Sequence, residues 1–367
     1  MGLTTGPVPA RIDGDVKAGL LLLIDHAETQ GWSRCRAAVR LGLAESRQRR
    51  WDSTRQAGGD LTDAVPGGNP LHGLLPEERD AIIQVHEGWG EIDRSHRKLA
   101  HRGSRLGRVH VSESTVLRVL QQAGLSLPGT PRREPVPRTP FPDWLVWKPN
   151  RIWAYDYTHF PRAKRAAVAA IDVVSRKWLA TLVSVEETST QVESVFCDAL
   201  ESEDLLDISW DHGSADLRVA LANGDRDTID QLAATGDVPL LLAISDNGPQ
   251  MKSVSTREFL AGVAIAQQFG RPGTPTDQAW IETLFGHVKG EHPHLELFTD
   301  PAELEAELGQ VRTHYNTVRL HAGIGYVTPD DEHEGRGEGL RQARRLGLQQ
   351  ARQHRIEYRR HQQADTP

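Results

Sequence analysis

The spacing of hydrophobic residues changes near residue 150, and this change divides the chain into two kinds of structure. Before that point, apolar residues recur every three or four positions, which is typical of helices with one buried face. The predicted helices cover residues 15–31, 33–41, 45–52, 76–86, 95–101 and 111–124. Ser33 and Ser112 stand where two of them begin, and a serine hydroxyl at that position can accept a free backbone N–H.

Beyond residue 150, shorter runs rich in β-branched and aromatic residues alternate with turn residues. They predict strands over residues 152–158, 166–174, 178–185, 240–245 and 264–269. Helices are predicted over residues 190–200, 256–261, 278–289 and 301–316. Strands first, then alternating strands and helices, indicate an α/β domain with a mixed sheet over residues 150–330.

The first helices, within residues 1–58, have a pattern typical of DNA-binding modules. A helix, a tight turn at Gly42 and a second helix match a helix-turn-helix. Arg47, Arg49 and Arg50 on the second of these would face phosphates or base edges of DNA. A plain helical hairpin with a solvated basic face is the alternative interpretation.

A second helical unit is predicted over residues 70–127, after a stretch rich in glycine and proline. Its last helix would expose Arg118. Both a second DNA-binding module, winged or not, and a structural spacer fit this pattern. Residues 128–149 contain seven prolines among several arginines, which excludes a continuous helix and predicts an extended basic linker.

Charge is distributed unevenly around a net value of −7. Residues 1–150 contain 21 Lys and Arg against 17 Asp and Glu, whereas residues 186–237 contain 14 acidic and 2 basic residues. The tail, residues 331–367, is basic, and could be a helix on DNA or a neighbouring subunit, or a solvated tail. Because DNA affinity depends on local cationic surface, the acidic stretch should face away from bound DNA.

Nothing in the sequence indicates a membrane or an oxidising compartment. No apolar run approaches the length of a transmembrane helix, and the first ten residues do not resemble a signal peptide. Cys35 and Cys197 are too few for a disulfide framework or a zinc site. A reducing cytoplasm is therefore expected, with no membrane partner.

Three acidic residues are the strongest indication of chemistry. Asp156 lies in the first predicted strand, Asp246 ends the fourth, and Glu282 lies on the helix predicted over residues 278–289. Carboxylates in such places can jointly hold hard divalent cations, which clamp the attacking and leaving oxygens of a phosphodiester. Each has an ordinary alternative: Asp156 as a strand residue bonded to Thr158, Asp246 as a turn cap, and Glu282 as an exposed helix residue.

Together these residues resemble the DDE transposase and retroviral integrase superfamily, and most closely transposases of bacterial insertion sequences with helix-turn-helix modules before the catalytic core. The resemblance rests on the gap of about thirty-five residues from Asp246 to Glu282, on Lys289 two helical turns later, and on residues 273–279, 315–321 and 328–329. Gln278 departs from the pattern, because the family commonly has Asn there.

The resemblance implies an RNase H-like fold and a recombinase that cleaves and joins DNA. Asp156, Asp246 and Glu282 would be both the catalytic residues and the ligands of two Mg²⁺ ions, which Mn²⁺ can replace. Lys289 and Arg319 would contact DNA. The implied partners are terminal inverted repeats and target DNA, bound by a homo-oligomer in the bacterial cytoplasm at the nucleoid.

Two other functions fit the same sequence. A metal-dependent nuclease on this fold would cut DNA without joining it. A DNA-binding regulator with an inactive core would bind terminal repeats without needing a metal. The sequence is also compatible with an enzyme that requires a partner ATPase.

Overall fold

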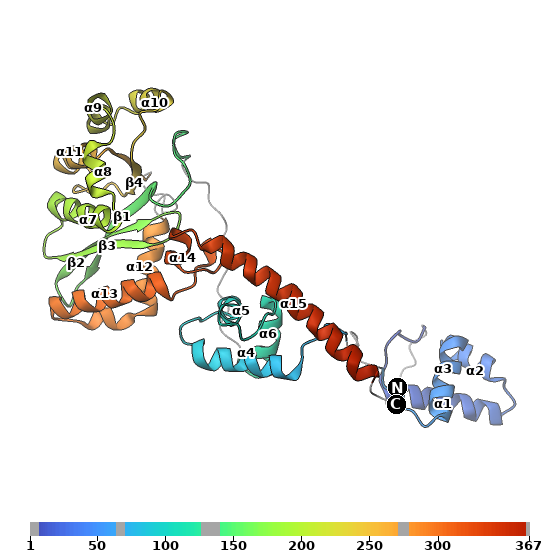
Figure 1. Cartoon of the computed structure of the whole chain (residues 1–367). Helices are drawn as coiled ribbons and strands as arrows, with labels where there is room; N and C mark the ends of the chain where they lie inside the picture. Colours follow the sequence, from blue (N-terminus) through green and yellow to red (C-terminus); the bar gives the residue numbers. More distant parts are fainter. Residues whose placement is uncertain (1–6, 64–69, 126–139, 271–278, 365–367) are drawn as a thin grey trace. The chain divides into compact units, whose positions relative to one another are not determined.

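The computed structural model describes residues 7–63, 70–125, 140–270 and 279–364 (Figure 1). The chain divides into two compact units, Met1–Gly73 and Leu74–Pro367. The second predicted helical unit, residues 70–127, therefore belongs largely to the same unit as the predicted α/β core. The linker prediction for residues 128–149 lies in part outside the described residues, as do Asp277 and Gln278.

The first unit consists of three helices around a small core, as predicted. They are α1 (Gly14–Thr29), α2 (Arg34–Arg40) and α3 (Glu45–Gln56). The Ser33 hydroxyl accepts a hydrogen bond from the Arg36 backbone N–H at 3.3 Å and so begins α2 where the sequence predicts. The buried side chains include Leu21, Ile24 and Trp51.

The second unit opens with α4 (Pro76–Trp89), α5 (His96–Arg105) and α6 (Glu113–Gln122), which we call the α4–α6 module. These match the predicted helices, and the Ser112 hydroxyl caps α6 by accepting from the Thr115 backbone N–H at 3.2 Å. Leu99, Val116 and Leu120 are among the side chains that form the module's own core.

A five-stranded mixed sheet follows, which confirms the predicted α/β core. Its strands are β1 (Ile152–Phe160), β2 (Arg165–Asp172), β3 (Trp178–Ser184), β4 (Leu241–Ser245) and β5 (Ile265–Phe269). Their order is β3-β2-β1-β4-β5. β1, β2 and β3 pair antiparallel, whereas β1–β4 and β4–β5 pair parallel.

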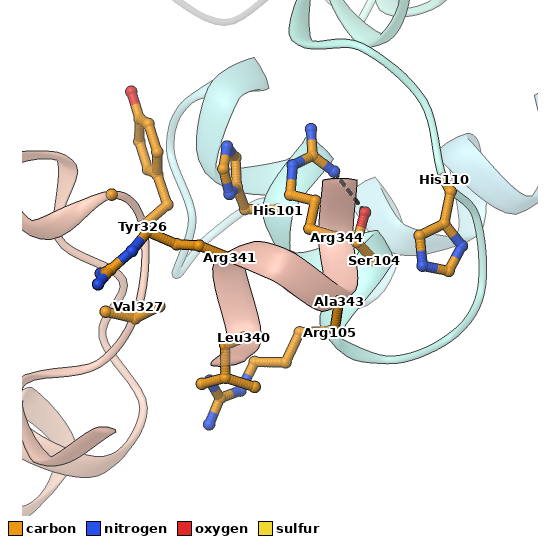
Figure 2. Close-up of a pocket in the computed structure, with 11 residues that line it drawn as sticks. His101, Ser104, Arg105, His110, Tyr326, Val327, Leu340, Arg341, Ala343 and Arg344 are labelled. Carbon is orange, nitrogen blue, oxygen red and sulfur yellow. Dashed lines mark hydrogen bonds between the residues drawn. The ribbon is translucent and has the colours of Figure 1, made fainter. Parts of the chain in front are cut away.

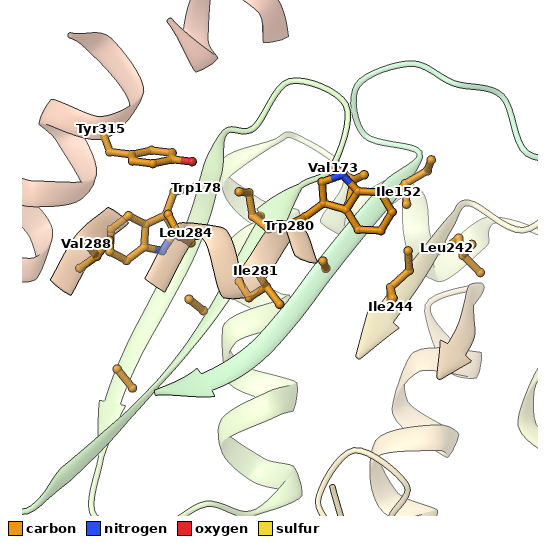
Figure 3. Close-up of a cluster of buried hydrophobic side chains, with 14 of the residues drawn as sticks. Ile152, Val173, Trp178, Leu242, Ile244, Trp280, Ile281, Leu284, Val288 and Tyr315 are labelled. Atoms are coloured by element: carbon orange, nitrogen blue, oxygen red, sulfur yellow. The ribbon is translucent and has the colours of Figure 1, made fainter. Parts of the chain in front are cut away.

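Both faces of this sheet are buried, because alternate residues of β1 enter different cores. Ile152 and Ala154 join one hydrophobic cluster, and Trp153 and Tyr155 join the other. Helices cover both faces. They are α7 (Ser189–Ser202), α11 (Val254–Gly262), α12 (Ala279–Glu291) and α13 (Pro301–Thr317). Figure 3 shows α12 lying along the strands, with its apolar side chains directed at them.

The acidic stretch forms three helices that the sequence analysis did not predict. They are α8 (Leu206–Asp211), α9 (Ala215–Asn223) and α10 (Arg226–Ala234), inserted between α7 and β4. Local chemistry accounts for α9 and α10: Ser214 and Asp225 cap their first turns, and Gly224 ends α9 at a φ of 66°.

Within the described residues, most of the basic tail is a helix, and its predicted contact with DNA or a neighbouring subunit stays a prediction. After α14 (Pro329–His333), α15 (Gly337–Ala364) runs back along the α4–α6 module. Arg344 donates to the carbonyls of Ala100 and Val111 at 2.9 and 3.1 Å. Figure 2 shows Arg344 next to Ser104 of α5, to which it also donates. Arg355 donates to both carboxylate oxygens of Glu78 at 2.7 and 2.9 Å.

A buried ion pair lies within the α4–α6 module, and its arginine also bonds to the core. Arg102 Nε donates to Asp93 at 2.6 Å, and the side chains of both residues are almost entirely buried. Another guanidinium nitrogen of Arg102 donates to the Val318 carbonyl at 2.7 Å, beyond the end of α13. The same guanidinium lies over the Trp89 ring, 4.0 Å from its centroid. The Arg102 side chain therefore stabilises the inside of the α4–α6 module and also connects this module to the core.

Within the ranges that the structure describes, no helix combines the length and the apolar character needed to cross a membrane.

Candidate active site

Neighbouring parallel strands bring Asp156 and Asp246 together. In the β1–β4 register, Ala154 pairs with Ile244, and both of these residues belong to the cluster beneath α12. Two positions further along each strand stand Asp156 and Asp246, the latter directly after the last residue of β4. Since alternate strand residues share a face, both carboxylates are placed on the side of the sheet that α12 covers.

Glu282 approaches the same region from α12. Trp280, Ile281 and Leu284 fix this helix on the sheet, as Figure 3 shows, whereas Glu282 itself is exposed. An acidic residue that is left exposed on a helix with a buried face is free to bind a ligand. The carboxylates of Asp156, Asp246 and Glu282 thus come from separate parts of the sequence and lie on the face of the sheet that α12 covers.

The charges of these residues affect one another. Burial raises the pKa of Asp156, a hydrogen bond from the Tyr157 backbone N–H lowers it, and the negative charges of Asp246 and Glu282 raise it further, to about 6. Both neighbours are therefore close enough to disfavour the ionised form of Asp156. A divalent cation between the carboxylates would offset this repulsion, and oxygen donors are the type that Mg²⁺ prefers.

The carboxylates are neighbours rather than a closed set of ligands. Asp156 accepts from the Tyr157 backbone N–H at 2.7 Å, rather than from Thr158, and Asp246 accepts from the Gly248 backbone N–H at 2.9 Å. The bond to Gly248 is the turn geometry expected of Asp-Asn-Gly. In the described part of the chain, no three Asp, Glu, His or Cys side chains lie close enough to share one ion. Residues 271–278, which precede α12, are outside that part.

Asn247 is a residue near this site that the sequence analysis treated only as turn chemistry. Its side-chain amide donates to the Gly270 carbonyl at 2.6 Å. This bond ties the segment after Asp246 to the end of β5, next to which residues 271–278 begin. The Asp-Asn-Gly sequence could have suggested a positioning role, because an Asn side chain can bridge two loops as well as form a turn.

Lys289 shares α12 with Glu282 but makes bonds within the protein. Its ammonium donates to the His159 carbonyl at 2.7 Å and pairs with Glu296 at 2.9 Å. It also lies 5.1 Å from the centre of the Phe160 ring. Lys289 therefore clamps α12 to the end of β1, and its predicted DNA contact stays a prediction.

Arg319 requires a correction. It is only 5% exposed, and it donates to both oxygens of Glu291 at 2.6 and 2.8 Å. Its neighbour His321 is also buried and bonds to the same guanidinium. Arg319 thus belongs to a buried, hydrogen-bonded helix end, and its guanidinium is engaged within the protein rather than exposed for DNA.

The arginines predicted to contact DNA in the helical modules differ in how exposed their guanidinium groups are. Arg47 donates to the carbonyls of Val8 and Pro9 at 2.8 and 2.7 Å, and lies over the Trp51 ring. Its guanidinium therefore stabilises the first unit. The other three, Arg49, Arg50 and Arg118, are exposed, with Arg49 paired to Glu45 in its own helix.

Comparison with known proteins gives one family match. Residues 263–329 match the family model of the integrase core domain. This segment contains β5, α12 and α13, and hence Glu282 and Lys289.

Several curated relatives come from insertion sequences. The chain is 26% identical over 186 residues to the transposase for insertion sequence element IS904 of Lactococcus lactis, and spans 61% of that protein and 50% of its own length. It is 23% identical over 222 residues to an uncharacterised protein of insertion element IS407 from Burkholderia multivorans, covering 69% of that protein and 60% of this chain. A protein of insertion element IS476 from Xanthomonas euvesicatoria is 32% identical over 130 residues, 34% of each chain.

Among solved structures, the chain is similar to the HTLV-2 integrase catalytic core domain in complex with magnesium, with 19% identity and a TM-score of 0.33 over 51% of this chain and 97% of that one. It is also similar to a chain of a simian T-cell lymphotropic virus intasome, with 18% identity and a TM-score of 0.37, covering 69% of this chain and 74% of that one. Similarity at this level adds no detail to the site.

Proposed function

Because this chain is a member of the DDE transposase and retroviral integrase superfamily, we propose that it cleaves the ends of a mobile DNA element and joins them to target DNA. The observation that carries the proposal is the position of Asp156 and Asp246 on paired neighbouring strands, on the face of the sheet covered by α12, the helix that carries Glu282. Three carboxylates from separate elements gain nothing in stability from this arrangement. Their placement is explained if they bind cations and DNA phosphates.

In this proposal, Asp156, Asp246 and Glu282 hold two Mg²⁺ ions, for which Mn²⁺ can substitute. Bound divalent ions would supply Lewis-acid activation of a water or 3′ hydroxyl and stabilise the leaving oxygen. Asp156 stands on β1 and Asp246 directly follows the paired strand β4, so the sheet would hold the two carboxylates at a fixed separation. Glu282, exposed on α12, would complete the set. Asn247 would position the segment that follows Asp246.

A direct test uses the full-length protein and a labelled duplex carrying the ends of its own element. We expect cleavage and strand joining in Mg²⁺ or Mn²⁺, and loss of both after chelation with EDTA, while DNA binding remains. Joined products distinguish a transposase from a nuclease, which would give cut products only. Metal-independent binding without any cleavage would instead identify a DNA-binding regulator and overturn the proposal.

We further propose that the first unit contributes to recognition of the terminal repeats. Arg50 is exposed on α3, and no side-chain bond of it appears among the described residues. Its guanidinium is therefore available to a phosphate, unlike that of Arg47.

The variant Arg50→Ala is expected to bind terminal-repeat DNA more weakly and with a smaller salt dependence, because each lost phosphate contact lowers the slope of log K against log salt by about 0.9. Binding is measured by fluorescence anisotropy across a salt series. Arg36→Ala, which removes an exposed charge from α2, is the matched control. If both variants behave alike, the effect is one of general charge, and α3 does not have the proposed role.

A further inference from the structure

A cavity of about 170 Å³ lies on the face of the sheet that α12 covers. A cavity of comparable size, roughly 150 Å³, can hold a single aromatic ring. Leu242 of β4 and Ala266 of β5 line this cavity, and both belong to the hydrophobic cluster beneath α12. Its other described walls come from α10 and from the segment that precedes β1. The cavity is therefore part of the same face that carries Asp156 and Asp246.

Two polar side chains in the lining have no partner among the described residues. Gln268 of β5 is 9% exposed, and its side-chain amide forms no hydrogen bond within the described ranges. The indole N–H of Trp144 is buried and also lacks an acceptor there. An amide offers two donors and an acceptor, and an indole offers one donor. Because unsatisfied polar groups destabilise a protein interior, a ligand that bonds to them would be favoured.

The strand register places Gln268 beside the candidate catalytic carboxylates. Gln268 pairs with Ile244 in the parallel β4–β5 ladder, and Ile244 stands two positions before Asp246. Parallel strands lie about 4.8 Å apart and rise about 3.3 Å per residue, so the Cα atoms of Gln268 and Asp246 are expected roughly 8 Å apart. Alternate strand residues share a face, which puts both side chains on the side of α12. A ligand in the cavity would thus lie next to the proposed cation site.

The remaining walls suit a flat, uncharged ring. Phe141 and Trp144 supply aromatic surface, and the Phe141 ring lies 6.1 Å from that of Trp280 at the start of α12. Every nucleobase can stack on an aromatic side chain, because every base has a π-face. Arg226 and Asp230 of α10 also line the cavity, and both are exposed. Their charges are opposite, so this pair favours neither an anion nor a cation.

We propose that this cavity receives an unpaired nucleobase of the DNA strand held at the carboxylates, and that Gln268 recognises the edge of this base. The proposal rests on the proposed function, which brings DNA to this face of the sheet. A glutamine amide pairs with both N6 and N7 of adenine, so adenine is the expected base. The Trp144 N–H would donate to an acceptor of the ring, and Phe141 would contact its face. The contact would give the site a base preference next to the cleaved bond.

The test uses full-length protein and duplexes from the ends of its own element, in which the base next to the cleaved bond is unpaired and is A, C, G or T in turn. An unpaired base leaves the stack at the lowest cost. We expect fluorescence anisotropy to show about tenfold tighter binding with adenine than with cytosine. Gln268→Leu, which keeps the size of the side chain and removes its amide, should abolish this difference. Gln231→Leu, which changes an exposed glutamine of α10, is the matched control and should keep it.

Thermal unfolding without DNA distinguishes base recognition from a structural role. Gln268→Leu removes an unsatisfied buried amide, so its melting temperature should be at least that of the wild type. A lower melting temperature would assign Gln268 to the core and overturn the inference. Equal binding of adenine and cytosine by the wild type would also overturn it and would mean that the cavity holds only water, while cleavage would leave the proposed function intact. A wild-type protein that neither binds nor cleaves these duplexes would refute both.

Discussion

Replacing Asp156 by Asn is expected to abolish strand cleavage while leaving DNA binding and folding intact. Asn has nearly the same shape but lacks the negative charge that a divalent cation needs. Loss of several kcal/mol of transition-state stabilisation corresponds to a rate decrease of roughly a thousandfold or more. The substitution also removes one of three repelling carboxylates, so thermal stability without metal should not decrease. Activity and stability are thus expected to diverge.

The measurement is cleavage of a labelled terminal duplex in Mg²⁺, with binding followed separately by anisotropy. Asp198→Asn is the matched control, because Asp198 is an exposed acidic residue on α7. It should retain the wild-type rate. If Asp156→Asn also cut or joined DNA at that rate, the chemistry would belong to another site, and the assignment of Asp246 and Glu282 would lose its basis.

Replacing Arg102 by Met is expected to have the largest effect on stability. Met keeps much of the aliphatic volume but leaves Asp93, which is 0% exposed, without the cation that neutralises it. Breaking a buried ion pair from one side costs about 3–5 kcal/mol. The variant also loses the hydrogen bond to the Val318 carbonyl, so the α4–α6 module should detach more easily from the core.

Urea denaturation gives the loss of stability, and amide hydrogen exchange shows whether α4–α6 loses protection first. Arg94→Ala provides the comparison, since this exposed neighbour makes only a bond to a nearby carbonyl. It should change stability by less than about 0.5 kcal/mol. A wild-type midpoint for Arg102→Met would mean that Asp93 is hydrated or protonated in the folded protein.

Local signals explain most of what could be predicted from the sequence. Ser33 and Ser112 cap helices where expected, and the alternation of β1 gave the strand that carries Asp156, because capping and strand periodicity depend on residues a few positions apart. The same holds for β2 and β3, which match the strands predicted over residues 166–174 and 178–185.

The features that could not be predicted depend on contacts between residues far apart in the sequence. Arg319 has a charge that suits DNA, but its partner Glu291 is 28 positions away, and no local pattern shows that the two will be buried together. Arg344 and Arg355 of α15 bond to residues more than 230 positions earlier, so the sequence left both a helix and a solvated tail open. α8–α10 are short, with 6, 9 and 9 residues, so each offers little periodicity from which to predict a helix.

The return of α15 to the α4–α6 module has a consequence during synthesis. At about 5–20 residues per second, a ribosome needs roughly ten to fifty seconds to proceed from α5 to the arginines of α15. During that time the α4–α6 module lacks the hydrogen bonds that Arg344 and Arg355 give it in the finished chain. Chains interrupted before α15 would contain all five strands of the sheet, but they would lack the hydrogen bonds that Arg344 and Arg355 make to the α4–α6 module.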